Sequence, residues 1–345
     1  MKEFVKKFIE ICREADLQEK IEDFADIEED NIPLRINKEN FRSFKEFEGC
    51  KKMIFVDGGN AELISTANIS VQLIRTYGAA FEKKRLFSIR KENYLIVRAI
   101  KNASNSRIDY KAEFSPKYFD FEMSSFEENL REGRNRIPIS RVGEIARRLC
   151  ELKTANLLSG KFKDSIIILD GNLKSSIPVE QNFLEQLYNT SVKNNNVVAA
   201  LSKTSQLITK NGQSLNSLLM KISTSLNLKE WCYYPIAKIT DKNHQADIAI
   251  VKLHRKSKHC FNFEIYKKQS DKIEEVLWFL RENSKDPSFF GYPYGLIDAD
   301  RFARISNKER DYLKTILLAQ IPKRILKDFV LNDSHETLNR LAGIK

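Results

Sequence analysis

Two short segments of the chain each end an apolar run with an aspartate followed by a glycine. Residues 54–59 read Ile-Phe-Val-Asp-Gly-Gly, and residues 166–171 read Ile-Ile-Ile-Leu-Asp-Gly. A short apolar run is typical of a buried strand, and a glycine after it is typical of a turn. The pattern therefore predicts two strands that deliver Asp57 and Asp170 to a sheet edge. There the carboxylates either cap a turn or, if they converge, hold a divalent cation.

A third carboxylate follows the sequence Gly-Tyr-Pro-Tyr-Gly at 291–295. The segment from Leu296 is predicted to be helical, and helix positions i, i+3, i+4 and i+7 share one face. That face holds Leu296, Ala299, Asp300 and Ala303. Asp300 is therefore predicted to point inward, where a carboxylate needs a cation, whereas Asp298 is predicted to face solvent.

A fourth acid is expected from a predicted helix over 140–158. Glu144 and Glu151 lie seven positions apart on one face of it, and spacing alone does not choose between them. Four carboxylates from separate elements suit Mg²⁺ or Mn²⁺. The chemistry that they serve best is phosphodiester hydrolysis, in which two ions roughly 4 Å apart activate a water and stabilise the leaving oxygen.

The balance of charge favours a polyanionic partner. The chain of 345 residues has 58 Lys and Arg against 47 Asp and Glu, a net charge of +11. Such an excess is typical of proteins that bind nucleic acid, although a basic protein without such a partner is the alternative. Lys203 directly follows a predicted strand and is a candidate phosphate contact or an ordinary surface lysine.

Neither a membrane span nor a metal-binding cysteine motif is evident. No apolar stretch approaches the roughly 20 residues that cross a membrane, and the start of the chain lacks the apolar core of a signal peptide. The five cysteines form no Cys-x-x-Cys pair, which argues against a zinc ribbon or a disulfide framework. We therefore expect a cytoplasmic protein.

The elements that must position these residues are predicted from apolar periodicity. Residues 1–30 are expected to be helical, with a stripe formed by Phe4, Val5, Phe8, Ile9 and Cys12. An antiparallel run is expected from strands at 53–56, 65–77 and 86–100. Residues 101–137 are polar and are expected to form an insertion or a long loop.

The second half of the chain alternates strand and helix, as in a parallel βαβ unit. This unit is predicted from a strand at 166–169, a helix at about 179–192 and a strand at 197–201. A late strand pair is expected at 248–253 and 260–266. Helices are expected at 273–280 and from 296 onward.

Together these motifs resemble the NurA family of archaeal and bacterial DNA-end-resection nucleases. They occur in the family's order, from about residue 50 to 306. The segments that carry the resemblance are Val56-Asp57-Gly58-Gly59, Glu151, Leu169-Asp170-Gly171-Asn172-Leu173, Ala200-Leu201-Ser202-Lys203-Thr204 and Gly291-Tyr292-Pro293-Tyr294 through Asp300.

The resemblance implies an α/β fold with an RNase H-like core, in which helices flank a mixed β-sheet. A nuclease domain is expected over 46–345, with an insertion around 101–137, behind an N-terminal helical arm over 1–45. The arm and the tail after residue 306 lie outside the resemblance. The implied activity is Mn²⁺- or Mg²⁺-dependent cleavage of single- and double-stranded DNA, as a 5′–3′ exonuclease and single-strand endonuclease with two ions. The implied partners are a second copy of the chain, a HerA-type hexameric ATPase and other double-strand-break repair proteins.

Carried over residue by residue, the resemblance makes Asp57, Glu151 and Asp170 metal ligands. It favours Glu151 over Glu144, because Glu151 precedes Asp170 by 19 positions, similar to the family spacing. Tyr292 matches a tyrosine that the family places near the site.

The chain departs from the family pattern at two positions. The family often has serine at the position of Gly59, and glycine there is expected to be harmless. The family often has histidine at the position of Asp300. Aspartate replaces histidine as a metal ligand, but not as a proton donor near neutral pH. The resemblance therefore implies the position of Asp300 in the site more directly than it implies the chemical role of this residue.

Two other functions compete with the nuclease. Asp57-Gly58-Gly59-Asn60 also resembles a phosphate loop of actin-like phosphotransferases, but 12 glycines without a second glycine-rich loop argue against a nucleotide cradle. The second competing function is a DNA-binding subunit with weakened catalysis. The aspartate at position 300, where the family often has histidine, is the one sequence feature that suggests it.

Overall fold

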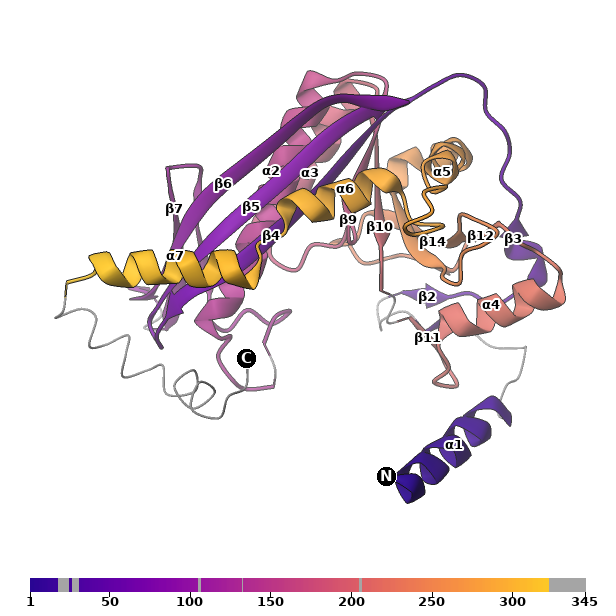
Figure 1. The fold of residues 1–345 in the computed structure, drawn as a ribbon, viewed down its shortest axis with the longest axis horizontal. Helices are drawn as coiled ribbons and strands as arrows, with labels where there is room; N and C mark the ends of the chain where they lie inside the picture. Colours follow the sequence, from indigo (N-terminus) through magenta and orange to yellow (C-terminus); the bar gives the residue numbers. More distant parts are fainter. Residues whose placement is uncertain (18–24, 27–30, 105–106, 132, 205–206, 323–345) are drawn as a thin grey trace. The chain divides into compact units, whose positions relative to one another are not determined.

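The computed structural model describes residues 1–17, 25–26, 31–104, 107–131, 133–204 and 207–322 (Figure 1). The chain divides into two compact units. The first unit comprises Met1–Met53, Asp164–Lys174 and Asn195–Gly295. The second comprises Ile54–Lys163, Ser175–Asn194 and Leu296–Lys345.

Five consecutive strands of the second unit are neighbours in the order β4-β5-β6-β7-β8, and β5 to β8 pair antiparallel (Figure 1). Residues on β6 alternate, with Leu95 and Val97 buried and Tyr94 and Ile96 exposed, as in a strand that has one covered face. The strands are β4 (Lys52–Ser65), β5 (Ile69–Glu82), β6 (Lys84–Lys101), β7 (Ile108–Ser115) and β8 (Asp120–Ser124).

One face of this meander is covered by α2 (Val142–Lys161), which packs against α3 (Pro178–Lys193). The short 3-10 helix η2 (Ile139–Arg141) precedes α2. Val142 and Leu149 of α2 share a buried core with Ile74 and Leu95 of the strands. Burial of each such side chain stabilises the fold by about 1.5–3 kcal/mol. The helix predicted at 140–158 is thus confirmed, although it begins at Val142 and has no side-chain cap.

The C-terminal helices α6 (Tyr294–Ala303) and α7 (Asn307–Gln320) are tied to β5 by a buried arginine. Arg75 donates from Nη1 to the carbonyl oxygen of Arg304 over 2.7 Å and pairs with Glu309 at the start of α7. Its Nε donates to Glu92 over 2.8 Å. No side chain of α7 is buried, so this ion pair is a main link between α7 and the sheet.

Acid is expected to weaken the link between Arg75 and Glu309. The hydrogen bond from Arg75 lowers the pKa of Glu309 below its ordinary value of 4.5. A carboxyl whose pKa is lower in the folded state stabilises the fold above the ordinary pKa, and this contribution is lost as pH falls through the lowered pKa. Urea unfolding from pH 7 down to pH values below 4.5 should therefore show a smaller loss of unfolding free energy for Glu309→Gln than for the wild type. Asp311→Asn is the control, and an unchanged pH profile for Glu309→Gln would contradict the assignment.

The first unit contains six strands in the order β3-β12-β14-β15-β10-β9. β9 and β10 pair in parallel, and the remaining neighbours pair antiparallel. The predicted βαβ unit is therefore confirmed, with α3 as its connecting helix. The strands are β3 (Phe41–Arg42), β9 (Ser165–Asp170), β10 (Val197–Ser202), β12 (Trp231–Tyr233), β14 (Ala246–Lys252) and β15 (Phe261–Tyr266).

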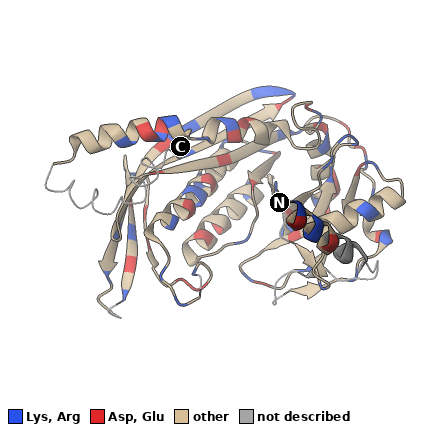
Figure 2. Cartoon of the chain, turned by 60° about the horizontal axis from the view of Figure 1, so that its bottom comes forward, with Lys and Arg blue, Asp and Glu red and all other residues tan. Residues whose placement is uncertain are grey.

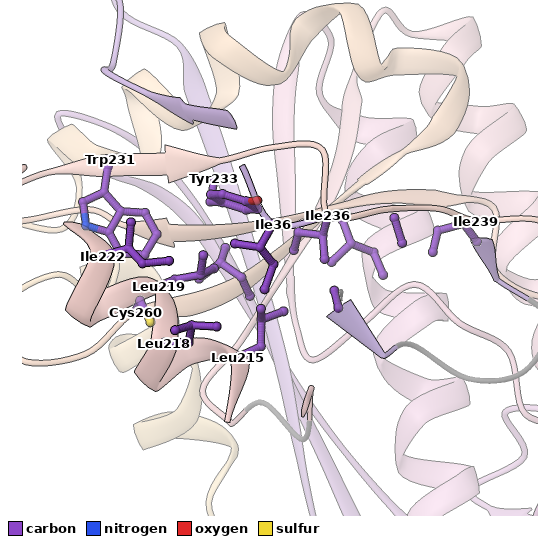
Figure 3. Packing of buried hydrophobic residues seen from close by; sticks show 14 residues of the cluster. Ile36, Leu215, Leu218, Leu219, Ile222, Trp231, Tyr233, Ile236, Ile239 and Cys260 are labelled. Atoms are coloured by element: carbon purple, nitrogen blue, oxygen red, sulfur yellow. The ribbon is translucent and has the colours of Figure 1, made fainter. Parts of the chain in front are cut away.

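A hydrophobic core in the first unit joins α4 (Leu215–Ser225) to these strands (Figure 3). Leu215 and Leu219 of α4 pack with Trp231, Tyr233 and Ile236. The first unit also contains the pairs β1 (Ala25–Asp26) with β11 (Ile208–Thr209) and β2 (Ile32–Pro33) with β13 (Ala237–Lys238). Its other helices are α1 (Lys2–Leu17), α5 (Ile273–Glu282) and the 3-10 helices η1 (Lys38–Asn40) and η3 (Lys267–Lys272).

The strands of the first unit pair both in parallel and antiparallel, and helices accompany the strands of both units. The predicted α/β fold, with a mixed sheet flanked by helices, is therefore confirmed. None of the described helices is long and apolar enough to cross a membrane.

Two expectations for the segments outside the site need correction. The stretch 101–137 is not an irregular loop, because it contains β7 and β8 as outer strands of the meander. The helical expectation for 1–30 holds for α1, but Ala25–Asp26 form a strand, and residues 18–24 and 27–30 lie outside the described part. The boundary between an arm over 1–45 and a domain over 46–345 stays a prediction.

Helix α1 carries acidic and basic residues interspersed along its length (Figure 2). Its apolar side chains Phe4, Val5, Phe8 and Ile9 are exposed. The side chain of Cys12, the fifth member of the expected stripe, lies outside the described part. The stripe is therefore not covered by the part of the chain that the structure describes.

Candidate metal centre

Asp57 lies in the middle of a strand, which corrects the expectation of a turn after it. β4 continues through Gly58 and Gly59 to Ser65. Neighbouring atoms lie so close to Gly58 and Gly59 that neither position has room for a side chain. A Cβ on Gly58 would lie 2.7 Å from Oε1 of Glu151, and one on Gly59 would lie 2.4 Å from the carbonyl oxygen of Ala303. Because successive strand positions face opposite sides, α2 and α6 approach β4 from its two faces.

Substitution of Gly59 is expected to disturb the site. The carbonyl oxygen of Ala303 is backbone, so a new Cβ is relieved only by moving α6, which carries Asp300. Gly59→Ala should lower the free energy of unfolding by about 1–3 kcal/mol, the usual effect of overpacking. It should also weaken Mn²⁺ binding, measured by calorimetry. Gly160→Ala is the control, since the nearest atom to its Cβ is 4.0 Å away. Equal behaviour of the two variants would contradict this reading.

The expectation that glycine in place of the family's serine at position 59 is harmless stays a prediction. Serine adds the same Cβ, which has no room at 2.4 Å from the carbonyl oxygen of Ala303.

The two acids of α6 are placed differently from the helical-face prediction. Asp298 is buried, with a residue exposure of 5%, whereas the side chain of Asp300 is 38% exposed. Asp298 pairs with Arg85 of β6 over 2.5 Å and accepts from the hydroxyl of Tyr77 over 3.2 Å. Burial raises the pKa of Tyr77, which keeps this hydroxyl protonated as a donor. Asp298 is therefore a structural anchor of α6 and not a solvent-facing residue.

Asp300 pairs with Arg304 over 3.7 Å, one turn further along α6. The apolar stripe beside it is as predicted, with Leu296, Ala299 and Ala303 buried. Asp300 lies at the margin of this stripe, where a carboxylate remains half-solvated and available to an ion.

Spacing in the sequence does not choose between Glu144 and Glu151 of α2. In the structure, Glu151 is the acid that faces inward. Its side chain is 2% exposed, against 65% for Glu144. Two arginines neutralise it: Arg147 over 2.5 Å, and Arg148 over 3.4 Å. Arg147 also donates to the carbonyl oxygen of Gly58 over 3.3 Å, next to Asp57 in β4.

Arg148 connects Glu151 to a second buried carboxylate. Its Nε lies 3.3 Å from Oε1 of Glu180 on α3, whose other oxygen accepts from the amide of Ser176 over 2.8 Å. A buried charge is tolerated only when it is paired and hydrogen-bonded, and this chain of alternating charges meets that condition. It holds the carboxylate of Glu151 against β4.

In the first unit, Asp170 ends β9 as predicted. Gly171 follows with φ of +111°, a conformation that favours glycine, and its amide donates to the carbonyl oxygen of Leu201 over 3.2 Å. Nζ of Lys203 lies 2.8 Å from Oδ2 of Asp170. Lys203 thus contacts an acid of the predicted site, and its contact with a phosphate stays a prediction.

Tyr292 is fully buried and lies beneath Lys203. Its ring stacks on Phe289 at 5.3 Å between centroids and packs on Phe261 at 5.2 Å. Nζ of Lys203 lies 5.4 Å from the centre of the Tyr292 ring, a cation–π distance. Tyr292 therefore positions the lysine that pairs with Asp170.

Three of the predicted ligands form an acidic cluster. Asp57, Asp170 and Asp300 each offer a carboxylate oxygen, and these oxygens lie within 4.8 Å of one another. Glu151 is not part of this group. Carboxylate oxygens in such a set suit the hard cations Mg²⁺ and Mn²⁺, so the donor chemistry fits a divalent ion.

A comparison with family models decides the affiliation of the chain. The model of the NurA domain matches residues 51–305. The chain belongs to the NurA family. The matched region includes every residue of the acidic cluster, and also Glu151, Lys203 and Tyr292.

Solved structures show more distant similarity. The NurA nuclease from Sulfolobus solfataricus shares 12% identity, with a TM-score of 0.48 over 82% of this chain and 88% of that chain. Argonaute from Aquifex aeolicus shares 9% identity, with a TM-score of 0.32 over 74% of this chain and 28% of that chain. Kluyveromyces polysporus Argonaute with a guide RNA shares 12% identity, with a TM-score of 0.31 over 79% and 30%. No curated protein matches by sequence.

Several supporting residues of this NurA domain were missed by sequence reasoning. Arg147 and Arg148 stand four and three positions before Glu151, a spacing at which helical side chains meet. Glu264 of β15 accepts from the amide of Leu173 over 2.7 Å and from His244 over 2.8 Å, and so fixes the loop after Asp170. The arginine spacing was visible in the sequence, whereas the contact of Glu264 with residues 91 and 20 positions away was not.

Proposed function

We propose that the chain is a divalent-metal-dependent deoxyribonuclease that hydrolyses phosphodiester bonds on an RNase H-like core. The observation that carries the proposal is the cluster of Asp57, Asp170 and Asp300 in a chain that belongs to a nuclease family. The three residues offer carboxylate oxygens within 4.8 Å of one another, and such oxygens are the ligands that Mg²⁺ and Mn²⁺ prefer.

Asp57, Asp170 and Asp300 are proposed as direct ligands of Mn²⁺ or Mg²⁺. Glu151 is proposed as a fourth ligand, of a second ion, once Arg147 turns away from it. Its approach to Gly58, next to Asp57, supports this assignment. Bound ions supply Lewis-acid activation of a water and stabilisation of the leaving oxygen.

The other residues of the site act on the substrate and on the ligands. Lys203 pairs with Asp170 and is proposed to contact a DNA phosphate as the strand enters. Tyr292 positions Lys203 from below. Asp300 stands where relatives often carry histidine and serves as an oxygen ligand, because a carboxylate is not a proton donor near neutral pH.

The resemblance to the family extends the proposal to the biological role. We propose end resection of DNA double-strand breaks, by 5′–3′ exonuclease and single-strand endonuclease activity, as a homodimer with a HerA-type hexameric ATPase and other repair proteins. The exposed apolar stripe of α1 is one candidate surface for either contact. A cytoplasmic location is proposed, and the free cysteines Cys50, Cys150, Cys232 and Cys260 are consistent with a reducing compartment.

The test is incubation of the pure protein with end-labelled single- and double-stranded DNA in Mn²⁺, in Mg²⁺ and in EDTA. Shortening of the DNA in either metal, but not in EDTA, is the expected result. Binding without shortening, even with the ATPase partner added, would favour a weakened DNA-binding subunit. ATP turnover without DNA would favour the actin-like phosphotransferase.

A further inference from the structure

We propose that a polar cavity on the α2 face of the sheet binds a nucleotide of the DNA strand, with its base edge on the cavity floor and a phosphate on two arginines. The inference rests on the proposed function and names the part of the substrate that the second unit holds. The cavity has a volume of about 650 Å³ and lies between β4, β5 and the segment that leads into α2. This volume is in the range of small-molecule sites.

The floor of the cavity is polar, although it belongs to the covered face of a sheet. Asn60, Glu62 and Gln72 line it, and Gln72 is almost completely buried. The amide of Asn60 donates to Oε1 of Gln72 over 3.2 Å. Such a face normally carries apolar residues, so this polar floor indicates a polar occupant.

The floor is held rigidly by its neighbours. Nε2 of Gln72 donates to the carbonyl oxygen of Ser140 over 2.6 Å and to Ser70 over 3.2 Å. Oγ of Ser70 donates in turn to Glu62 over 3.2 Å. A Cβ on Gly143 would lie 1.7 Å from Oε1 of Gln72, so the start of α2 rests directly on the amide. Side chains fixed in this way present their hydrogen-bonding groups in a defined geometry.

The wall of the cavity supplies positive charge from the segment before α2. Arg136 stacks over Phe126 with its Cζ 5.6 Å from the ring centre. Arg141 donates to the carbonyl oxygen of Leu130 over 3.3 Å and lies 3.9 Å from Glu144. Both guanidinium groups line the cavity and are at least partly exposed. Arginine presents a planar fork that suits phosphate oxygens.

The mixture of charges favours a nucleotide over a bare anion. Glu62 and Glu144 line the same cavity as Arg136 and Arg141, and two acids would repel phosphate alone. Carboxylates and amides pair with the donors and acceptors of base edges, while arginines take the phosphate. The described lining includes no aromatic side chain, so the base is held by its edge and not by stacking.

The cavity is lined in part by β4 and α2, two elements that also carry proposed metal ligands. Asn60 follows Asp57 by three positions in β4, roughly 10 Å along an extended strand. On α2, Glu144 and Glu151 share a face with Arg147 between them. Asp57 and Asn60 face opposite sides of β4, whereas Glu151, the proposed ligand of a second ion, shares the α2 face of the sheet with the cavity. A strand whose phosphate lies at Glu151 therefore has a neighbouring nucleotide within reach of the cavity.

The first test measures binding without cleavage. A 5′-fluorescein-labelled 12-nucleotide single strand is titrated in EDTA and followed by anisotropy. The Arg136→Ala/Arg141→Ala variant should bind at least about 10-fold more weakly than the wild type. The control, Arg98→Ala/Lys111→Ala, removes the same charge from the other face of the meander and should weaken binding by less than about threefold. Equal loss in both variants, with far-ultraviolet circular dichroism unchanged, would overturn the proposal.

The second test locates the nucleotide. Single strands that carry 4-thiothymidine at one position each are irradiated with the metal-free protein, and the cross-linked peptides are mapped. Cross-links from one or two positions to residues 60–62 or 130–144 are expected. Absence of such cross-links, while cross-links form elsewhere, would overturn the inference even if DNA is cleaved in Mn²⁺. Cross-links at the cavity without any cleavage would support the inference and contradict the proposed nuclease.

Discussion

Replacement of Asp57 by asparagine is expected to reduce DNA cleavage by about 10³-fold or more, equivalent to at least about 4 kcal/mol of transition-state stabilisation. Asp57 is buried within β4, and Oδ1 accepts from the amide of Gly58 over 2.7 Å. Asparagine keeps that acceptor and the side-chain shape, so the fold should persist. It removes the negative charge that the site offers to a cation.

The measurement pairs cleavage rates in Mn²⁺ with calorimetric titration of Mn²⁺ into the DNA-free protein. Asp57→Asn should lose at least one order of magnitude in metal affinity, with an unfolding midpoint close to that of the wild type. The exposed Asp271 provides the matched control, because Asp271→Asn removes the same charge from η3. Near-normal cleavage by Asp57→Asn, or equal losses in both variants, would remove Asp57 from the metal centre.

Replacement of Asp298 by alanine is expected to lower the free energy of unfolding by about 3 kcal/mol. The change breaks the buried pair with Arg85 and leaves the hydroxyl of Tyr77 without its carboxylate acceptor. An unsatisfied buried hydroxyl alone costs about 1–3 kcal/mol. Because α6 carries both Asp298 and Asp300, cleavage should fall as well, but only as the helix loosens. The measurement is urea unfolding at pH 7.

Measuring both the free energy of unfolding and the Mn²⁺ affinity of variants at Asp298 and at Asp300 distinguishes the roles of these two acids of α6. Asp300→Asn should leave the free energy of unfolding nearly unchanged, because its partner Arg304 is an exposed residue, and should reduce Mn²⁺ affinity. Asp298→Asn should lower the free energy of unfolding and leave the Mn²⁺ affinity nearly unchanged. A stable Asp298 variant combined with an unstable Asp300 variant would show that the helix is rotated from the orientation described above.

The sequence correctly indicated elements whose signal is local. The apolar runs at β9 and β10 and the helix between them predicted a parallel βαβ unit, because strand and helix have different periods of apolar residues. A glycine after an apolar run indicates a turn, which places Asp170 at a strand end, and Gly171 has the positive φ that glycine favours. Arg147 and Glu151 were likewise within reach of a local rule, since positions i and i+4 on a helix meet.

The errors arose where distant residues decide the outcome. Gly58 and Gly59 were interpreted as a turn, yet they lie within β4 because α2 and α6 need the space of their missing side chains. Asp298 was assigned to solvent, because helical periodicity gives the angle between side chains but not which neighbours cover them. The covering partner, Arg85, lies 213 positions away in the chain.

By itself, the sequence determined the acidic set, the α/β class and the resemblance to the NurA family, because these depend on residue types in chain order. Only the tertiary structure decided which acids gather. It brought Asp57, Asp170 and Asp300 together, buried Asp298 against Arg85 and opened a polar cavity beside Asn60. The physical reason is that the burial and pairing of a charge are set by contacts between elements, and the chain encodes those contacts only through the fold.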